Sequence, residues 1–276
     1  MMQIKNGFSK LKFAGMLVLG VLCGQLAAQH LDVPYVPTPH EVVDAMLDVT
    51  NTGPGDYVID LGSGDGRIVI AAAKRGAFGH GIDLNPVRVE EAEENARKSG
   101  VSDRVIFLKG DLFDANISRA SVVTMYLLSS VNLRLKPVLF EQLRPGTRIV
   151  SHSFSMGNWR PDETLVLDNR HVYYWVIPAN VKGSWEWESN GELFTMNISQ
   201  DFQKITPEIR TGNRALIVTE PSVNGERISF SAVNRDNGNM YVFSGIVEDT
   251  TITGTCQIRT GDSRKLENWT ATLTRR

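Results

Sequence analysis

Several features are scarce in this chain of 276 residues, and each scarcity excludes a class of protein. There are two cysteines, and Cys256 stands alone if Cys23 belongs to a cleaved leader, so no disulfide framework is expected. The 29 basic and 31 acidic residues give a formal charge of −2, which does not indicate a nucleic-acid-binding surface. No group of His and Cys residues has the spacing of a metal site, so no metal is expected.

Long apolar runs are scarce as well. The apolar run Phe13–Gly24 is short for a helix that crosses a bilayer. Three lysines precede it, and the small residues Ala27 and Ala28 follow it, which is the order of a secretory signal peptide over residues 1–28. We therefore expect an exported protein, periplasmic or extracellular, with a membrane anchor as the alternative and no membrane contact beyond this leader. Its removal takes away three lysines and no acids, which leaves a formal charge of −5.

The most informative feature that is present is a glycine-rich turn. Tyr57–Leu61 has the pattern of a short strand, and Ile68–Ala73 has that of an apolar helix. Between them lie Gly62, Ser63, Gly64, Asp65, Gly66 and Arg67. Glycine allows positive φ and close approach of the backbone to a ligand, and a helix N-terminus favours a nucleotide-like cofactor. A dinucleotide fingerprint needs a third glycine where this chain has Arg67. We expect Asp65 to be a turn or helix-start acid rather than a ligand, and Arg67 to be a local salt-bridge partner rather than a catalyst.

Acids stand at the ends of three consecutive predicted strands. Asp60 ends the first, and its charge suits a cofactor with a cationic amino-acid end. Asp83 ends the second and can accept hydrogen bonds from ribose hydroxyls, whereas Asp111 ends the third and can take an adenine amino group. Ligands bind outside the carboxyl ends of parallel strands, where all three acids lie. The predicted cofactor-binding residues are Tyr35, Thr38, Asp60, Gly62, Ser63, Gly64, Gly66, Asp83, Leu84, Asp111 and Leu112.

Strand and helix patterns alternate as far as residue 180. Thr38 predicts a helix N-cap, with Glu41 completing a capping box, and Asn85 and Gly100 bound a later helix. Further strands are predicted at Ser121–Leu128, Thr147–His152, Leu165–Leu167 and Val172–Ile177, and a further helix at Val131–Leu143. This alternation predicts an α/β fold with a Rossmann-like parallel sheet in a domain spanning residues 29–180, closed by an antiparallel edge pair.

The pattern changes near Val181. Helical periodicity ends, and short alternating segments separated by turn signals follow. These segments are Trp185–Glu188, Leu193–Ile198, Arg227–Phe230, Tyr241–Phe243, Thr251–Thr253 and Asn268–Leu273. Residues 181–276 are therefore predicted to form a small antiparallel β-barrel or sandwich without a catalytic constellation, and Cys256 is expected to be a buried strand thiol.

Residues 35–178 resemble the class I S-adenosylmethionine-dependent methyltransferases. The glycine turn is similar to their first motif, and three passages resemble the branch of lysine methyltransferases that includes the enzyme for the ATP-synthase c-subunit. The passages are Asp60–Val69, Ile82–Pro86 and Ser153–Pro161. The resemblance implies a seven-stranded methyltransferase sheet, S-adenosylmethionine as cofactor, and N-methylation of a protein lysine or similar amine. This branch has a Gly-Val-Pro-type segment where the chain has Tyr126–Ser130, so the acceptor does not follow from the resemblance.

Candidates near the reacting methyl group lie after the fourth and fifth strands. They are Tyr126 and His152 as catalytic residues, with Trp159 beside them. Packing or stacking on the cofactor is the alternative for Tyr126, and an ordinary strand-end hydrogen bond is the alternative for His152. A non-catalytic exported binding protein and a nicotinamide-dependent oxidoreductase are the competing functions. The expected partner is a protein that accepts the methyl group, and no nucleic acid is expected; the oligomeric state is open.

Overall fold

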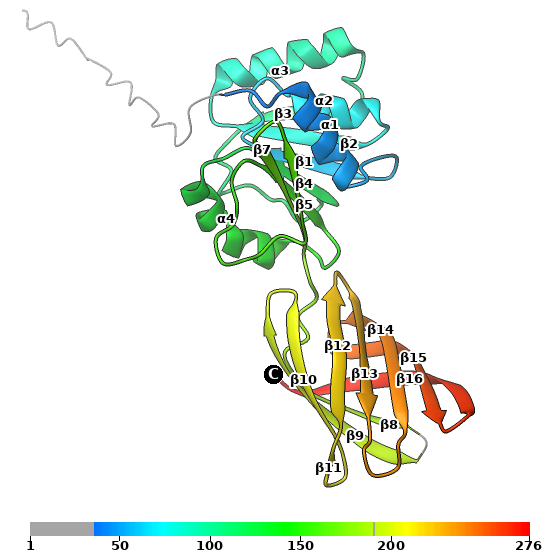
Figure 1. Ribbon diagram of the computed structural model, residues 1–276. Coiled ribbons are helices and arrows are strands. Elements are labelled where there is room, and N and C mark those ends of the chain that lie inside the picture. Colours follow the sequence, from blue (N-terminus) through cyan, green and yellow to red (C-terminus); the bar gives the residue numbers. More distant parts are fainter. Residues whose placement is uncertain (1–35, 190) are drawn as a thin grey trace, which may run out of the picture. The chain divides into compact units, whose positions relative to one another are not determined.

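The computed structural model describes residues 36–189 and 191–276. The predicted leader at residues 1–28 and the predicted site residue Tyr35 lie outside the described residues. The described chain forms an α/β region followed by an antiparallel β region (Figure 1). None of the helices in these two ranges combines the length and apolar character needed to cross a membrane.

The α/β region has one mixed sheet with helices on both faces. Its described helices are α1 (His40–Val49), α2 (Arg67–Lys74), α3 (Pro86–Ser99) and α4 (Ser129–Gln142). Its strands are β1 (Tyr57–Leu61), β2 (Phe78–Asp83), β3 (Val105–Lys109), β4 (Val122–Met125), β5 (Arg148–His152), β6 (Glu163–Leu167) and β7 (Arg170–Val176). The sheet order is β3-β2-β1-β4-β5-β7-β6, and β7 runs antiparallel to both of its neighbours. The predicted seven-stranded sheet and its antiparallel edge pair are confirmed.

Alternation along the strands divides the core into two faces. Val58, Val122 and Val150 point to one face and pack with α1 and α2. Their neighbours Ile59 and Val123 point to the other face and pack with α4. The helices cover the two faces of the sheet. The predicted acids lie at the carboxyl ends of the strands, next to the loops that follow them.

The helix boundaries follow local signals in one case and not in another. The side chain of Asn85 accepts a hydrogen bond from Val87 N at 3.0 Å, and Gly100 ends α3 with a φ of 70°, as predicted. The capping box predicted at Thr38 is wrong. Helix α1 begins at His40 with Pro39 at its N-cap and no side-chain cap, while Thr38 Oγ1 lies 3.2 Å from His152 Nδ1. Buried His152 needs a polar partner, and that need outweighs the local capping preference of Thr38.

The β region is a nearly closed barrel. Its strands are β8 (Gly183–Ser189), β9 (Glu192–Asp201), β10 (Lys204–Thr211), β11 (Arg214–Ala215), β12 (Ile217–Asn224), β13 (Arg227–Val233), β14 (Met240–Glu248), β15 (Thr251–Thr260) and β16 (Ser263–Arg275). Each strand pairs with the next except β11 and β12, and β16 pairs back onto β8. β12 lies beside β10 without a hydrogen-bonded ladder. The barrel alternative is therefore confirmed over the sandwich, and β10 and β12 are strands that the sequence patterns did not predict.

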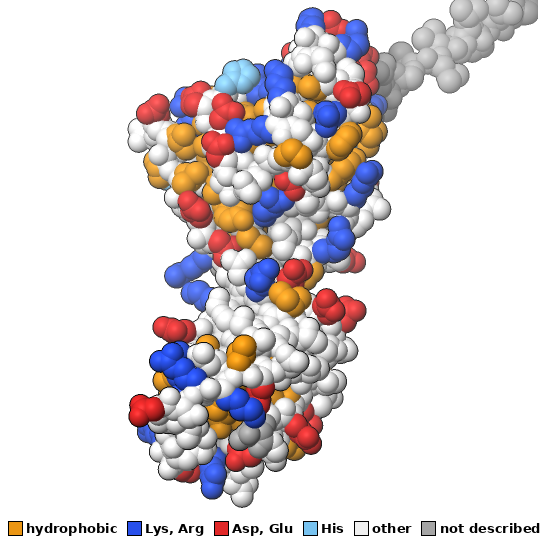
Figure 2. Space-filling view, turned by 90° about the vertical axis from the view of Figure 1, so that its right-hand side faces the viewer, with side chains coloured by type: hydrophobic (Ala, Val, Ile, Leu, Met, Phe, Trp, Pro, Cys, Tyr) orange, Lys and Arg blue, Asp and Glu red, His pale blue; other side chains and the backbone are white. Residues whose placement is uncertain are grey.

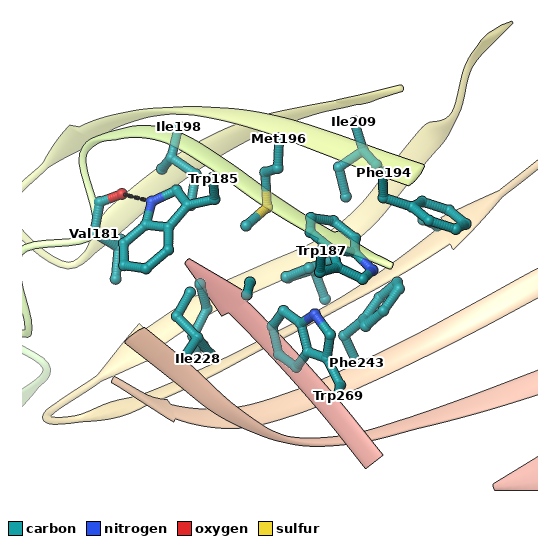
Figure 3. Close-up of a cluster of buried hydrophobic side chains, with 14 of the residues drawn as sticks. Val181, Trp185, Trp187, Phe194, Met196, Ile198, Ile209, Ile228, Phe243 and Trp269 are labelled. Carbon is teal, nitrogen blue, oxygen red and sulfur yellow. Dashed lines mark hydrogen bonds between the residues drawn. The ribbon is translucent and has the colours of Figure 1, made fainter. Parts of the chain in front are cut away.

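Large aromatic side chains fill the barrel interior (Figure 3). Trp187 lies between the rings of Phe194, Phe243 and Trp269, with centroid distances of 5.3, 5.4 and 5.8 Å. Trp185 Nε1 donates to the backbone oxygen of Val181 at 2.8 Å, the dashed contact in Figure 3. Among the described residues, the indole nitrogens of Trp187 and Trp269 have no hydrogen-bond partner. As predicted, Cys256 is a buried strand thiol in β15, and burial raises its pKa to about 12.

Candidate active site

Strand register brings three of the predicted site residues, Asp60, Asp83 and His152, to one face of the sheet. Asp60 on β1 pairs with Gly81 on β2 and with Thr124 on β4, and Thr124 pairs with Val150 on β5. Residues paired across strands point to the same face, as do residues two apart on one strand. Asp83 and His152 therefore share the face of Asp60 at the carboxyl ends of their strands. The ring of Tyr126, just beyond β4, lies 4.0 Å from that of His152 and joins the same group.

The glycine turn has a backbone that only glycine adopts easily. Gly62, Gly64 and Gly66 have φ values of 80°, 52° and 79°. A Cβ on Gly62 would lie 2.9 Å from Leu127 Cδ2, and one on Gly66 would lie 2.6 Å from Phe107 Cζ. The amide of Gly64 donates to Asp83 Oδ2 at 2.9 Å, which fixes the turn against the end of β2. The turn is therefore tied directly to the second of the three acids.

Asp60 is a buried acid with a raised pKa. Only 2% of its surface is exposed, and Thr124 Oγ1 donates to its Oδ1 at 2.7 Å. Burial raises the pKa of Asp60 to about 7; the Thr124 hydrogen bond lowers it, and the nearby charges of Asp83 and Asp65 raise it further. A ligand that brings a positive charge to Asp60 would stabilise its carboxylate.

Ser63 supplies an independent test of whether a cofactor fits this turn. Its hydroxyl is buried and has no hydrogen-bond partner among the described residues. A Cβ on Gly81 would lie 2.5 Å from this hydroxyl, so Ser63 can pack here only because residue 81 is glycine. An orphaned hydroxyl, a cradle of glycines and a buried acid fit S-adenosylmethionine. Asp60 would hold its amino group, Asp83 its ribose and Asp111 its adenine.

The remaining predicted cofactor residues lie at the same strand ends. Leu84 follows β2 and is half-buried, and Leu112 follows Asp111 and packs against the α4 face of the core. Asp111 is exposed, and its Oδ1 accepts a hydrogen bond from Phe113 N at 2.9 Å. Among the described residues, no group of His, Cys, Asp or Glu could hold a metal ion.

The side chain of Arg67 connects the turn to the segment before α1. Arg67 Nη2 lies 2.6 Å from Asp65 Oδ2, which confirms the predicted local salt bridge. Arg67 Nη1 also donates to the backbone oxygen of Thr38 at 2.8 Å. Since Thr38 Oγ1 contacts His152, the glycine turn and the end of β5 are linked through the backbone and side chain of one residue.

His152 lies in an aromatic cluster at the carboxyl end of β5. The ring of Tyr126 lies 4.0 Å from His152 and 6.0 Å from Phe154. His152 is buried, and its Nε2 has no hydrogen-bond partner among the described residues. Burial lowers the pKa of His152 to about 4, and the charge of Arg170 adds to this effect. The imidazole is therefore neutral at neutral pH.

Trp159 does not join this group. It is completely buried, and its ring packs against Phe140 and Trp175 in the core beneath α4. The prediction that it lines the reacting methyl group is wrong, because the loop after β5 turns this indole back into the core. Thr124 is a site residue that the sequence analysis missed. Its position two residues before Tyr126, on the strand next to β1, is the signal that could have found it.

A sequence model of the ANTKMT methyltransferase domain matches residues 60–163. A protein-lysine N-methyltransferase of Saccharolobus islandicus (strain REY15A) is 46% identical over 151 residues, which cover 52% of this chain and 94% of that protein. The chain belongs to this methyltransferase family. The ATP synthase c-subunit lysine N-methyltransferase of Xenopus laevis is 33% identical to this chain over 166 residues, which cover 55% of this chain and 73% of that protein.

A solved structure supports the cofactor. The crystal structure of an RNA methyltransferase from Salinibacter ruber in complex with S-adenosyl-L-homocysteine is 55% identical, with a TM-score of 0.52. The match covers 53% of this chain and 96% of that one. The methyltransferase uses S-adenosylmethionine, and the comparisons favour this activity over both the oxidoreductase and the non-catalytic alternative.

Proposed function

We propose that the protein transfers a methyl group from S-adenosylmethionine to the side-chain amine of a lysine in another protein. The observation that carries the proposal is the neutral, buried His152 with its unpartnered Nε2, next to Tyr126 and on the face of Asp60. Relatives named as lysine N-methyltransferases, at 46% and 33% identity, support the same acceptor chemistry.

A lysine must lose its proton before its nitrogen can attack. When bound, the cofactor supplies a methyl group on a positively charged sulfur, which needs no further activation by the protein. Burial of the acceptor beside the rings of Tyr126 and Phe154 disfavours its charged form, because low-dielectric surroundings lower a lysine pKa. The aromatic faces still attract the cationic form on arrival, through cation–π contact.

His152 is placed to receive the proton at Nε2. In the tautomer whose Nδ1–H donates to Thr38 Oγ1, Nε2 carries the lone pair and points away from Thr38. The depressed pKa makes His152 a weak base, so it would hold the proton briefly and pass it on to water. Thr38 would fix the tautomer, and Arg67 would fix Thr38 through its backbone oxygen.

A protein acceptor is favoured over RNA by the charge of the chain. The formal charge is −2 for residues 1–276, and Figure 2 shows basic and acidic side chains interspersed on the face it presents. Binding to RNA backbones needs clustered positive charge. The similar protein from Salinibacter ruber is named an RNA methyltransferase, so RNA belongs in the test as a competing acceptor.

The test is methyl transfer from radiolabelled S-adenosylmethionine by the full chain. Separate reactions would receive a mixture of proteins and a mixture of RNA, and labelled protein would be hydrolysed and analysed for methylated amino acids. The proposal expects label in ε-N-methyllysine. Label confined to RNA, or to another amino acid, would overturn the lysine assignment.

Two variants make the test specific. Asp60→Asn should lower transfer through weaker cofactor binding, whereas His152→Gln should lower transfer while cofactor binding persists. Leu266→Ala on the barrel, where the side chain is 68% exposed, is the matched control and should behave as the unmodified chain does.

A further inference from the structure

The loop that leaves β5 carries the acceptor side of the site. This acceptor-side loop, residues 153–162, begins next to His152 and presents Phe154 to the ring of Tyr126. Its first half is held from within the α/β region, because the backbone oxygen of Phe154 accepts from Asn132 Nδ2 at 3.0 Å and from Ser151 Oγ at 2.7 Å.

The second half of the same loop is held by the barrel. Trp159 Nε1 donates to Gln203 Oε1 at 2.9 Å, and Gln203 Nε2 donates to the backbone oxygen of Arg160 at 2.7 Å. The same Nε2 lies 3.2 Å from Asp162 Oδ1. One side chain, at the tip of the β9–β10 hairpin, thus fixes the loop at three successive points.

The residue before Gln203 reinforces this contact. The ring of Phe202 lies 5.9 Å from Trp159 and 5.6 Å from Phe140, within the core beneath α4 and outside the core of the barrel. Phe202 has a φ of 55°, a conformation that a turn normally gives to Gly or Asn. A bulky residue is strained in this conformation, and its packing against the α/β core offsets the strain.

The hairpin is itself anchored where the chain enters the barrel. Gln200 Nε2 donates to the backbone oxygen of Phe202 at 2.7 Å and to that of Ala179 at 2.9 Å. Gln200 Oε1 accepts from Val181 N at 2.8 Å. The tip therefore cannot shift without breaking contacts to the segment that joins the two regions.

We propose that the β9–β10 hairpin braces the acceptor-side loop, and that Phe202 and Gln203 are positioning residues for methyl transfer. The proposal rests on the proposed function. Transfer requires the acceptor nitrogen to be aligned with the methyl group, and a misplacement of about 1 Å can cost about 100-fold in rate. The barrel then contributes to catalysis without touching either reactant, by fixing the loop that leads to Phe154 and His152.

The test compares Gln203→Leu and Phe202→Ala with the unmodified full chain. Both variants should lower kcat about 10- to 100-fold while the Kd for S-adenosylhomocysteine stays within about twofold. Phe202→Tyr keeps the ring and should retain the rate. Asn213→Ala, in the turn at the other end of β10, is the matched control and should change neither quantity.

Amide hydrogen exchange over residues 153–162 separates this proposal from the proposed function. Gln203→Leu should speed exchange through the loop as far as Phe154, whether or not a lysine acceptor has been found. If the unmodified chain methylates no lysine, the proposed function fails and exchange still decides whether the hairpin braces the loop. Unchanged exchange and kcat in both variants, or a parallel loss of cofactor affinity, would overturn the positioning role.

Discussion

Thr124 Oγ1 donates its hydrogen to Asp60 Oδ1 at 2.7 Å, between directly paired positions of β4 and β1. The bond favours the charged form of Asp60, but burial outweighs it and holds the pKa of this acid at about 7. The free protein therefore keeps an acid that is only part-ionised at neutral pH. A cationic group of the cofactor would complete its ionisation.

Replacement of Asp60 should weaken cofactor binding without lowering the stability of the fold. Asp60→Asn keeps an oxygen for Thr124 but loses the charge. We expect cofactor affinity to fall at least about 10-fold, because a hydrogen bond to a charged group contributes about 1.5–3 kcal/mol. Calorimetric titration with S-adenosylhomocysteine and S-adenosylmethionine measures this loss, with Leu266→Ala as the control. Unchanged affinity would remove Asp60 from the cofactor site.

The same variant should be more stable than the unmodified chain in alkaline solution. A raised folded pKa means that Asp60 binds its proton more tightly when folded, so its contribution to stability falls as pH rises from about 4 to about 7. The cost is about 1.4 kcal/mol per pKa unit. Urea unfolding of Asp60→Asn at pH 8 should therefore show a gain on the order of 2–4 kcal/mol that disappears near pH 4.

Cofactor binding should weaken in acid. If the carboxylate of Asp60 is the binding form, protons compete with the cofactor below the pKa of about 7. Affinity should then fall about tenfold per pH unit between pH 6 and 5. Titrations at a series of pH values measure this slope, and the slope should vanish in Asp60→Asn. A slope that persists in the variant would assign the effect to another group.

His152 should show the opposite dependence of stability on pH. Its folded pKa of about 4 lies below its ordinary value of 6.5, so its contribution to stability is complete above pH 6.5 and is lost as pH falls toward 4. His152→Gln should flatten the fall in unfolding free energy over this interval. It should also lower kcat about 100- to 10,000-fold, the range of a lost proton acceptor. Thr38→Val should lower kcat less.

Local patterns predicted most of the α/β region, because its elements are specified by residues close in sequence. Asn85 and Gly100 bound α3 as expected, and the acids stand at the strand ends. Thr38 shows where this reasoning fails, since its partner His152 is 114 residues away. The role of Phe202 could not be predicted for a related reason, because this turn residue packs against Trp159, which lies in the other region. The alternation of apolar and polar residues predicted several of the barrel strands. Closure of the barrel could not be predicted in this way, because it depends on the pairing of β16 with β8, which are far apart in the sequence.

Two glycines with similar backbones should respond differently to alanine. Gly66 and Gly100 have φ values of 79° and 70°, yet a Cβ would meet Phe107 and Ala92 only at Gly66. Gly100→Ala should cost about 1 kcal/mol of unfolding free energy, from the strained φ alone. Gly66→Ala should cost about 1–3 kcal/mol more, because it also overpacks the core. Equal losses in urea unfolding would contradict this difference.

Pairing of β16 with β8 also determines the order in which the chain can fold during synthesis. Every strand of the α/β sheet precedes residue 177, so that sheet can form while the ribosome is still translating the barrel. β8 can pair with β16 only after Leu273, the residue opposite Trp185, has been synthesised. Trp185 and Trp187 lack the cover of β16 in that interval, so the incomplete barrel exposes apolar surface that favours aggregation.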